Sequence, residues 1–190
     1  YGVVGLHPEN ISEDFDYTIF DNLDKKIVGI GEIGLDYHYT KDNKNKQIEV
    51  FERQLDIAEK LNLPVVIHSR DAAGDTLEIL KRHHNFGVIH SFSGSLEMAK
   101  EYIKLGFVLG VNGVVTFKNC NLGDTLKNID INSIILETDS PYLTPVPFRG
   151  IQNNPGKMIN TAKFVADIYG VSLEELAKIT NQNIKRIFDI

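Results

Sequence analysis

Five side chains that can bind a metal ion lie at the ends of short apolar segments in this 190-residue sequence. They are His7, Glu32, His68, His90 and Asp139. Imidazole nitrogens and carboxylate oxygens without a thiolate suit Zn²⁺, Mn²⁺, Mg²⁺ or Fe²⁺, so one or two divalent metal ions are the expected cofactor. One histidine at the end of a strand is more often a hydrogen-bonded core residue than a ligand, but five such positions favour a metal site.

Two acidic segments indicate what such a site could do. Glu32 has glycines on both sides, which permit close backbone approach, and it could bridge two ions about 3.5–4 Å apart as in a phosphoryl displacement. The alternative is a solvated glutamate in a surface loop. Asp139 precedes a stiff Ser-Pro turn and is the candidate to hold the attacking water or to deprotonate it. Glu137 should point to the same side, as a second catalytic residue, a support for a ligand, or an ordinary buried acid.

Positive side chains near these positions could bind an anionic substrate. Arg70 closely follows His68, and Arg149 lies in a Pro-Val-Pro-Phe-Arg-Gly segment. The guanidinium fork suits phosphate, so both arginines are candidate substrate-binding residues, and Lys118 is a weaker one. Each could equally be an ordinary surface charge. The formal net charge of −6 gives no basic surplus for indiscriminate nucleic-acid binding, so a metal or a few placed arginines must supply positive charge locally.

The composition is that of an ordinary globular protein, with 42% hydrophobic and 24% charged residues. This length suits a single domain spanning residues 1–190. No apolar run approaches the ~20 residues of a membrane span, and the single cysteine, Cys120, cannot form an internal disulfide. These features predict a cytoplasmic protein with no membrane partner.

Short apolar segments alternate with amphipathic ones along the chain. Six strands are expected, at residues 1–6, 27–30, 64–67, 88–89, 107–110 and 134–136. Helices are expected over 11–23, over 44–61, after a capping Asp71, between Ser95 and Gly106, up to Gly170, and from Ser172 to Ile187. The clearest is 44–61, in which one apolar stripe is formed by Ile48, Phe51, Leu55 and Ala58.

This alternation is typical of βαβ units and a parallel sheet. A complete (β/α)8 barrel takes ~250 residues, or about 31 for each unit, so this chain corresponds to about six units. We therefore predict an α/β fold of TIM-barrel type that lacks about two units. In a parallel barrel the carboxyl ends of the strands share one face, which would bring the five candidate ligands together. A doubly wound open sheet is the alternative, although no glycine-rich phosphate motif follows a strand.

Six sequence motifs resemble those of the TatD-type metal-dependent deoxyribonucleases, in the same order and over the whole chain. They are GLHP (5–8), GEIGLDY (31–37), VIHSRDA (66–72), HSFSG (90–94), ETDSPYLTP (137–145) and PFRG (147–150). The resemblance implies an amidohydrolase-like (β/α)8 barrel with a divalent-metal centre that hydrolyses phosphodiester bonds in DNA. It implies metal ligation by Glu32, His68, His90 and Asp139. His7 and Arg149 match further motif positions, and His7 thereby joins the candidate substrate-binding residues.

One motif of that family is absent from this sequence. Family members open with a strand carrying His-x-His, which supplies two further ligands, whereas the one close pair here is the adjacent His83 and His84. We therefore expect a chain truncated at its N-terminus and lacking about the first two units. Its metal binding should be weakened, and its open sheet edges could self-associate. The alternatives to a DNA hydrolase are another amidohydrolase-like hydrolase and a catalytically impaired remnant.

Overall fold

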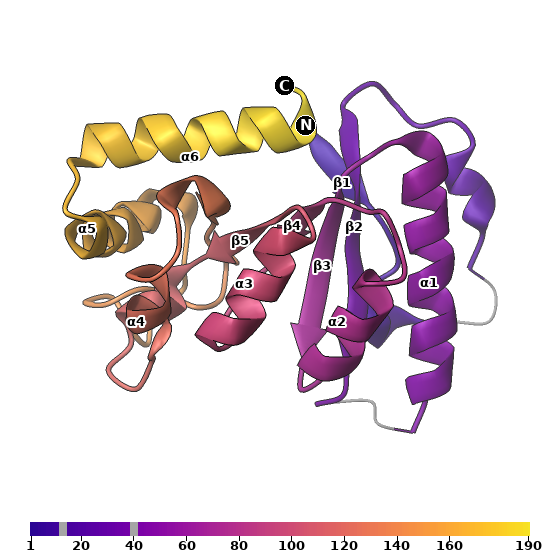
Figure 1. Ribbon diagram of the computed structural model, residues 1–190, viewed down its shortest axis with the longest axis horizontal. Helices are drawn as coiled ribbons and strands as arrows, with labels where there is room; N and C mark the ends of the chain where they lie inside the picture. The colour runs from indigo at the N-terminus through magenta and orange to yellow at the C-terminus, as the bar shows by residue number, and fades with distance from the viewer. Residues whose placement is uncertain (12–14, 39–41) are drawn as a thin grey trace. The chain divides into compact units, whose positions relative to one another are not determined.

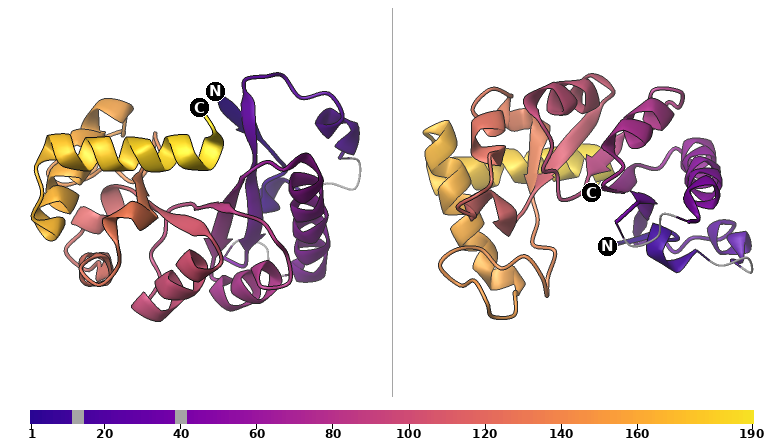
Figure 2. Two further views of the ribbon diagram at one scale, coloured as in Figure 1. Left: turned by 45° about the horizontal axis from the view of Figure 1, so that its top comes forward. Right: turned by 90° about the horizontal axis from the view of Figure 1, so that it is seen from below.

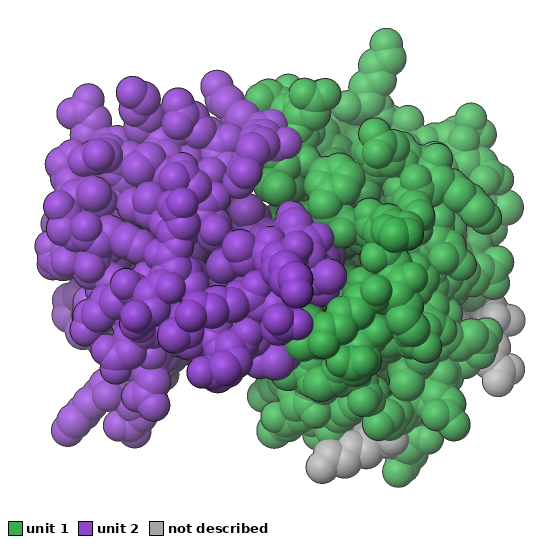
Figure 3. Space-filling model, in the orientation of Figure 1, with its two compact units in different colours: residues 1–89, 187–190 green, residues 90–186 purple. Residues whose placement is uncertain are grey.

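The computed structural model describes residues 1–11, 15–38 and 42–190, which form two compact units (Figures 1 and 3). Unit 1 comprises residues 1–89 and 187–190, and unit 2 comprises residues 90–186. Unit 1 contains strands β1 (Gly2–Val4), β2 (Ile27–Asp36), β3 (Val65–Arg70) and β4 (Gly87–Ile89), with helices α1 (Lys44–Leu61) and α2 (Ala73–Leu80). Unit 2 contains strands β5 (Phe107–Val111) and β6 (Ile134–Leu136), with helices α3 (Leu96–Lys104), α4 (Leu122–Leu126), α5 (Met158–Tyr169) and most of α6 (Leu173–Phe188). The single domain predicted from the chain length stays a prediction.

Neighbouring strands of each unit pair in parallel, as the sequence predicts. In unit 1 the strands follow the order β1, β2, β3, β4, and in unit 2 β5 pairs with β6. Helix α1 connects β2 to β3, and α2 connects β3 to β4, so these segments are βαβ units (Figure 2). Among the described residues, no helix combines the length and the apolar character that a membrane crossing requires.

The strands that carry the candidate ligands differ in length from the predicted ones. Strand β1 is shorter than residues 1–6, whereas β2 continues past Ile30 to Asp36, so Glu32 lies inside the strand. The extension persists because β2 keeps pairing with β3 as far as Asp36 and Arg70, after a register shift between Gly31 and Ile33. Strand β3 likewise includes His68 rather than ending before it.

Gly34 allows the two long strands to approach each other. Its φ of +144° is one that side chains rarely adopt, and an added Cβ would collide with the carbonyl oxygen of His68. A larger residue here would push β2 away from β3 at the level of the candidate ligands.

Two predicted helical features are wrong. In the described part of residues 11–23 the chain forms a single 3-10 turn over Tyr17–Phe20, whose first turn is capped by Asp16, and residues 12–14 lie outside the described residues. Asp71 does not cap α2, because the N-cap residue is Ala72 and no side chain caps it. The Asp71 carboxylate instead lies 3.0 Å from Nδ1 of His38. The contact with His38 thus takes the place of the capping role predicted for Asp71.

Helix α1 has the predicted bounds, and its apolar stripe packs against β2, with Phe51, Leu55 and Ala58 buried and Ile48 half-buried. The same face also carries two completely buried glutamines, Gln47 and Gln54, seven residues apart. The Gln54 amide accepts from the backbone N–H of Leu6 at 2.7 Å and donates to the carbonyl of Leu6 at 3.1 Å. The Gln47 amide makes the same pair of bonds with Asp36, both at 2.8 Å. Helix α1 therefore holds the backbone at two points next to candidate site residues.

The predicted ends of the helices in unit 2 are confirmed. Ser95 caps α3 by accepting from the N–H of Met98, and Gly170 ends α5 with a left-handed φ of 66°. The Ser172 hydroxyl accepts from the N–H of Glu175 at 3.1 Å, which is half of the expected capping box. The core of this unit surrounds β5, whose residues are all buried.

Replacing Gln54 by leucine should lower the free energy of unfolding by about 2–4 kcal/mol, because the buried N–H and C=O of Leu6 lose their partners. Urea-induced unfolding followed by circular dichroism measures this change. Gln182→Leu, at an exposed position of α6, is the matched control and should change stability by less than about 0.5 kcal/mol. A Gln54→Leu protein as stable as the control would show that the bonds to Leu6 contribute little.

Candidate metal centre

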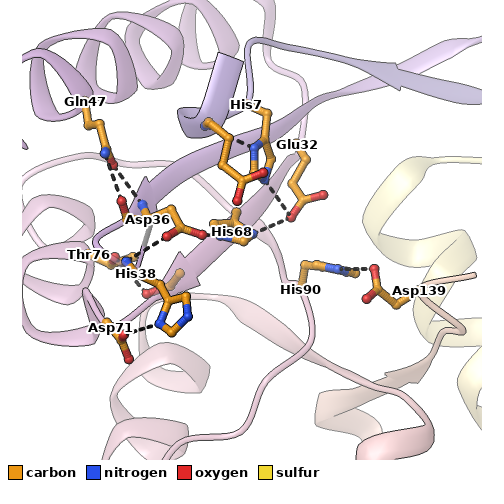
Figure 4. Close-up of polar contacts among 12 residues, drawn as sticks. His7, Glu32, Asp36, His38, Gln47, His68, Asp71, Thr76, His90 and Asp139 are labelled. Carbon is orange, nitrogen blue, oxygen red and sulfur yellow. Dashed lines mark hydrogen bonds and ion pairs between the residues drawn. The ribbon is translucent and has the colours of Figure 1, made fainter. Parts of the chain in front are cut away.

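Three of the candidate residues come together in unit 1. Ligand atoms of His7, Glu32 and His68 all lie within 4.8 Å of one another (Figure 4). Oε1 of Glu32 lies 2.8 Å from Nδ1 of His68 and 3.8 Å from Nε2 of His7. The two imidazole rings meet edge to face, with centroids 4.5 Å apart. The predicted neighbourhood of these three residues is therefore found within one unit.

Hydrogen bonds before and after His7 in the chain fix its position. Leu6 is fixed by Gln54, and His7 itself caps a 3-10 turn (Pro8–Asn10), with its Nδ1 accepting from the N–H of Glu9 at 3.2 Å. Burial and the neighbouring His68 lower the pKa of His7, so its ring is neutral. A neutral ring that accepts at Nδ1 carries its proton on Nε2. His7 consequently presents a hydrogen-bond donor toward Glu32, which suits binding of an anionic oxygen better than ligation of a metal.

The other side of His68 faces a carboxylate that sequence reasoning missed. Asp36 is completely buried, its Oδ1 accepts from the N–H of His38 at 2.8 Å, and its Oδ2 lies 2.9 Å from Nε2 of His68. Burial disfavours protonation of His68, but the hydrogen bonds to Glu32 and Asp36 outweigh it and raise the pKa of the imidazole. Asp36 lies four residues after Glu32, so an alternating strand pattern continued past Ile30 could have identified it.

A second group comes together in unit 2. His90, which directly follows β4 in the chain, lies between Glu137 and Asp139. Its Nδ1 is 2.8 Å from Oε2 of Glu137, and its Nε2 is 3.2 Å from Oδ1 of Asp139. Oε1 of Glu137 also accepts from the N–H of Ser91 at 2.6 Å. Gly110 leaves room for this carboxylate, because an added Cβ would lie 2.7 Å from Cδ of Glu137.

Each of the two imidazoles thus lies between a more buried and a more exposed carboxylate. The side chains of Asp36 and Glu137 are 0% and 16% exposed and accept from a backbone N–H, whereas those of Glu32 and Asp139 are 31% and 32% exposed. The less exposed carboxylate of each pair needs hydrogen-bond donors more than the other, so it takes the imidazole proton. Neutral His68 then carries its proton on Nε2, and neutral His90 carries its proton on Nδ1.

The ring nitrogens and carboxylate oxygens that remain are suitable ligands for a divalent cation. In its neutral form each histidine would have a lone pair on the nitrogen that faces the more exposed carboxylate, namely Nδ1 of His68 beside Glu32 and Nε2 of His90 beside Asp139. A carboxylate behind the far nitrogen is the usual support of a metal-bound histidine. The contacts of Glu137 are those of a residue that orients His90, and its predicted catalytic role stays a prediction. The expectation that Glu32, His68, His90 and Asp139 share one metal centre also stays a prediction.

The predicted substrate-binding arginines are exposed. Arg70 is the last residue of β3 in unit 1. Arg149, in unit 2, places its guanidinium 3.7 Å over the ring of Phe117, and its Nη1 lies 3.4 Å from the carbonyl oxygen of Thr144. Lys118 is exposed beside Phe117. No contact among these tests their predicted role with a substrate.

Another set of possible ligand atoms lies on the surface of unit 1. Atoms of Asp56, Glu59 and His83 also lie within 4.8 Å of one another. Both carboxylates are exposed, and Nδ1 of His83 is 3.5 Å from Oδ1 of Asp56. No buried carboxylate is recorded behind His83 in the described residues, so this set lacks the support found at His68 and His90.

Curated sequences similar to this chain are metal-dependent hydrolases by name. The family described as TatD related DNase matches residues 1–189. The uncharacterized metal-dependent hydrolase YabD of Bacillus subtilis is 40% identical over 198 residues, covering 100% of this chain and 78% of the relative. The uncharacterized metal-dependent hydrolase YcfH of Escherichia coli K12 is 40% identical over 192 residues, covering 98% of this chain and 72% of the relative.

A solved structure confirms the fold. The crystal structure of YJJV, a TatD homologue from Escherichia coli K12, matches with a TM-score of 0.92 at 29% identity, covering 100% of this chain and 77% of that one. Together with the six parallel strands, this match confirms the predicted α/β fold of TIM-barrel type. The chain spans 72–78% of these three relatives, in agreement with about six of eight barrel units.

Exchange of either Asp36 or Glu137 for the corresponding amide should reverse the tautomer of the imidazole that it faces. In Asp36→Asn the amide oxygen keeps the bond from His38, so the NH₂ group donates to Nε2 of His68 and moves the ring proton to Nδ1. Glu137→Gln should act in the same way on His90 and move its proton to Nε2.

Long-range proton–nitrogen NMR spectra of the metal-free protein, at a pH where both rings are neutral, report these tautomers. The exposed His84 is the internal control and should not respond to either exchange. An unchanged His68 spectrum in Asp36→Asn would contradict the assignment of its proton to Nε2.

Proposed function

This chain is a metal-dependent hydrolase of the TatD-related DNase family, and we propose that it hydrolyses phosphodiester bonds in DNA. The observation that carries this proposal is the pair of histidines that each lie between two carboxylates, with one ring nitrogen facing the less exposed carboxylate and the other facing a carboxylate that is about a third exposed. Such a donor set suits Mg²⁺, Mn²⁺ or Zn²⁺.

Glu32 and His68 in unit 1, and His90 and Asp139 in unit 2, are the proposed metal ligands. A bound divalent ion would supply Lewis acidity and a water of lowered pKa. Asp36 and Glu137 keep the two imidazoles oriented, because each carboxylate accepts from a backbone N–H with one oxygen and faces an imidazole nitrogen with the other.

Asp139 is the proposed base. Its carboxylate is about a third exposed and lies three residues after the end of β6, so a water beside it can be deprotonated as it attacks the phosphorus and the bond from phosphorus to the leaving oxygen breaks. His7 donates from Nε2 to a phosphate oxygen, since its Nδ1 is occupied by the N–H of Glu9. Arg70 and Arg149 are proposed to bind the flanking phosphates, which the net charge of −6 would otherwise repel.

Two alternative functions can be distinguished from DNA hydrolysis by experiment. An amidohydrolase-like reaction such as deamination or lactone hydrolysis is disfavoured because those enzymes often bridge their metals with a modified lysine, and none of the six described strands contains a lysine. A catalytically impaired remnant would keep the fold and lose turnover.

The 190-residue protein should hydrolyse bis(p-nitrophenyl) phosphate and single-stranded oligonucleotides after Mn²⁺ or Mg²⁺ is added, and chelation should abolish both activities. Glu32→Gln and His68→Ala should each lower kcat/KM by at least about 100-fold, since Lewis-acid stabilisation is worth several kcal/mol. His83→Ala, which removes the imidazole of the exposed ligand set, should keep activity. Metal analysis of the same samples should show loss of bound ion in the first two variants.

Activity toward nucleosides or lactones with none toward phosphodiesters would overturn the DNA hydrolase in favour of another amidohydrolase-like reaction. Bound metal without any turnover would identify an impaired remnant.

We also propose that the chain self-associates through open strand edges. Among the described strands β1 pairs with β2 alone, which leaves one row of its backbone groups without a strand partner. Sedimentation equilibrium should reveal a concentration-dependent dimer, and Val3→Lys at this partly exposed edge should weaken it. Ile159→Lys, at an exposed apolar position of α5, is the control. A monomer at every concentration would contradict the proposal.

A further inference from the structure

Ser91 has an unusual backbone conformation directly after the candidate ligand His90. Its φ of 48° lies in the left-handed region, which a residue with a side chain seldom adopts. In this conformation the N–H of Ser91 donates to Oε1 of Glu137 at 2.6 Å, and the other oxygen of Glu137 faces Nδ1 of His90. A strained backbone of this kind persists only where surrounding contacts hold it, so we searched the contacts of Ser91 for the group that does so.

Two hydrogen bonds attach Ser91 and its neighbour to the end of β5. The Nδ2 amide of Asn112, the residue directly after this strand, donates to the Ser91 hydroxyl at 2.8 Å. The N–H of Phe92 donates to the carbonyl oxygen of Gly110 at 3.0 Å. The side chain of Ser91 and the peptide group that follows it are therefore both held by one strand end.

The same strand end positions Glu137. The N–H of Glu137 donates to the carbonyl oxygen of Val111 at 3.0 Å, and the missing side chain of Gly110 leaves the space that the carboxylate occupies. The donor and the acceptor of the bond between Ser91 and Glu137 are thus both attached to residues 110–112. Of these attachments, the bond from Asn112 is the one made by a side chain, so a substitution can remove it.

The side chain of Asn112 is suited to holding another residue in place. It is 3% exposed, and its Oδ1 accepts from the N–H of Val114 at 3.1 Å. A backbone N–H can only donate, so this bond fixes the amide with its NH₂ group toward Ser91. An ionised aspartate here could accept from Val114 but could not donate to the hydroxyl, and an apolar residue could do neither. A buried amide that is bonded at both ends has little freedom to turn.

We propose that Asn112 is a positioning residue of the candidate metal centre. It holds Ser91 in the left-handed conformation, and this conformation directs the N–H of Ser91 at Glu137. Glu137 in turn orients His90, whose other ring nitrogen then faces Asp139. The inference rests on the proposed function in one respect, namely that His90 is a ligand of the metal ion.

A purely structural role of Asn112 predicts a different result, and Thr116 separates the two roles. Asn112 also caps the 3-10 turn Gly113–Thr116 through its Oδ1, so its replacement weakens this turn as well. The Thr116 hydroxyl stabilises the same turn by donating to the carbonyl oxygen of Gly113 at 2.7 Å. Thr116→Val therefore weakens the turn while the bond from Asn112 to Ser91 stays in place, which makes it the matched control.

Backbone NMR spectra of the metal-free 190-residue protein test the first link. A short bond to a carboxylate moves an amide proton downfield, so the Ser91 amide should resonate downfield in the wild type. Asn112→Ala should move this signal upfield, because the backbone of residue 91 relaxes toward negative φ. Ser91→Ala, which removes the acceptor of the same bond, should have the same effect on the amide of residue 91. Thr116→Val should leave the signal unchanged.

Calorimetric titration with Mn²⁺ tests the link to the metal centre. Asn112→Ala and Ser91→Ala should each raise the Kd for Mn²⁺ by about 10-fold, the lower end of the effect of residues that support metal ligands. The double variant Asn112→Ala/Ser91→Ala should lose no more than either single variant, because both substitutions remove the same bond. Asn112→Ala/Ser91→Gly should recover most of the affinity, since glycine adopts a positive φ without a bond to hold it. Thr116→Val should bind Mn²⁺ as the wild type does.

Three results would each overturn the positioning role in variants that keep the wild-type circular dichroism. They are an unchanged amide signal of residue 91 in both single alanine variants, an unchanged Kd for Mn²⁺ in both, and a loss in Thr116→Val equal to that in Asn112→Ala. If Asn112→Ala does not fold, Ser91→Ala carries the test alone. A wild type that hydrolyses phosphodiesters while these variants bind Mn²⁺ normally would leave the proposed function standing without this inference. A wild type that binds Mn²⁺ through this linkage and hydrolyses no phosphodiester would do the reverse.

Discussion

A carboxylate taken out of water must be surrounded by donors, and this requirement organises the candidate site. Asp36 is completely buried and Glu137 is 16% exposed, and each accepts from one backbone N–H and faces one imidazole nitrogen. The imidazole is thereby turned so that its other nitrogen faces a more exposed acid. The positions of the Asp36 and Glu137 carboxylates therefore set the orientation of His68 and His90.

Support for the site in unit 1 comes from a helix that contains none of its candidate ligands. Gln47 and Gln54 on α1 bond the backbone of Asp36 and Leu6, which places Asp36 against His68 and holds the residue before His7. In a barrel-type fold the outer helices usually contribute packing. Here an outer helix also sets where the polar residues of the strands lie, through bonds that cost stability if broken.

The spacing of apolar residues and the capping residues in the sequence predicted several helix bounds correctly. The bounds of α1, the caps at Ser95 and Ser172 and the stop at Gly170 were predicted because apolar spacing and local hydrogen bonds determine them. Predictions failed where nearby residues offered rival contacts. Asp71 pairs with His38 instead of capping α2, and β2 extends through two glycines because β3 continues to pair with it.

The sequence by itself determined the order of the six strands, the family, and the identity of most candidate ligands, because motifs and periodicity are properties of neighbouring residues. It could not determine which donors pair. His68 meets Asp36 across 32 positions and His90 meets Glu137 across 47, and only the folded chain brings such residues to hydrogen-bonding distance. Tertiary structure also decided burial, which separates a carboxylate that orients a histidine from one left exposed beside it, since desolvation depends on everything packed around the group.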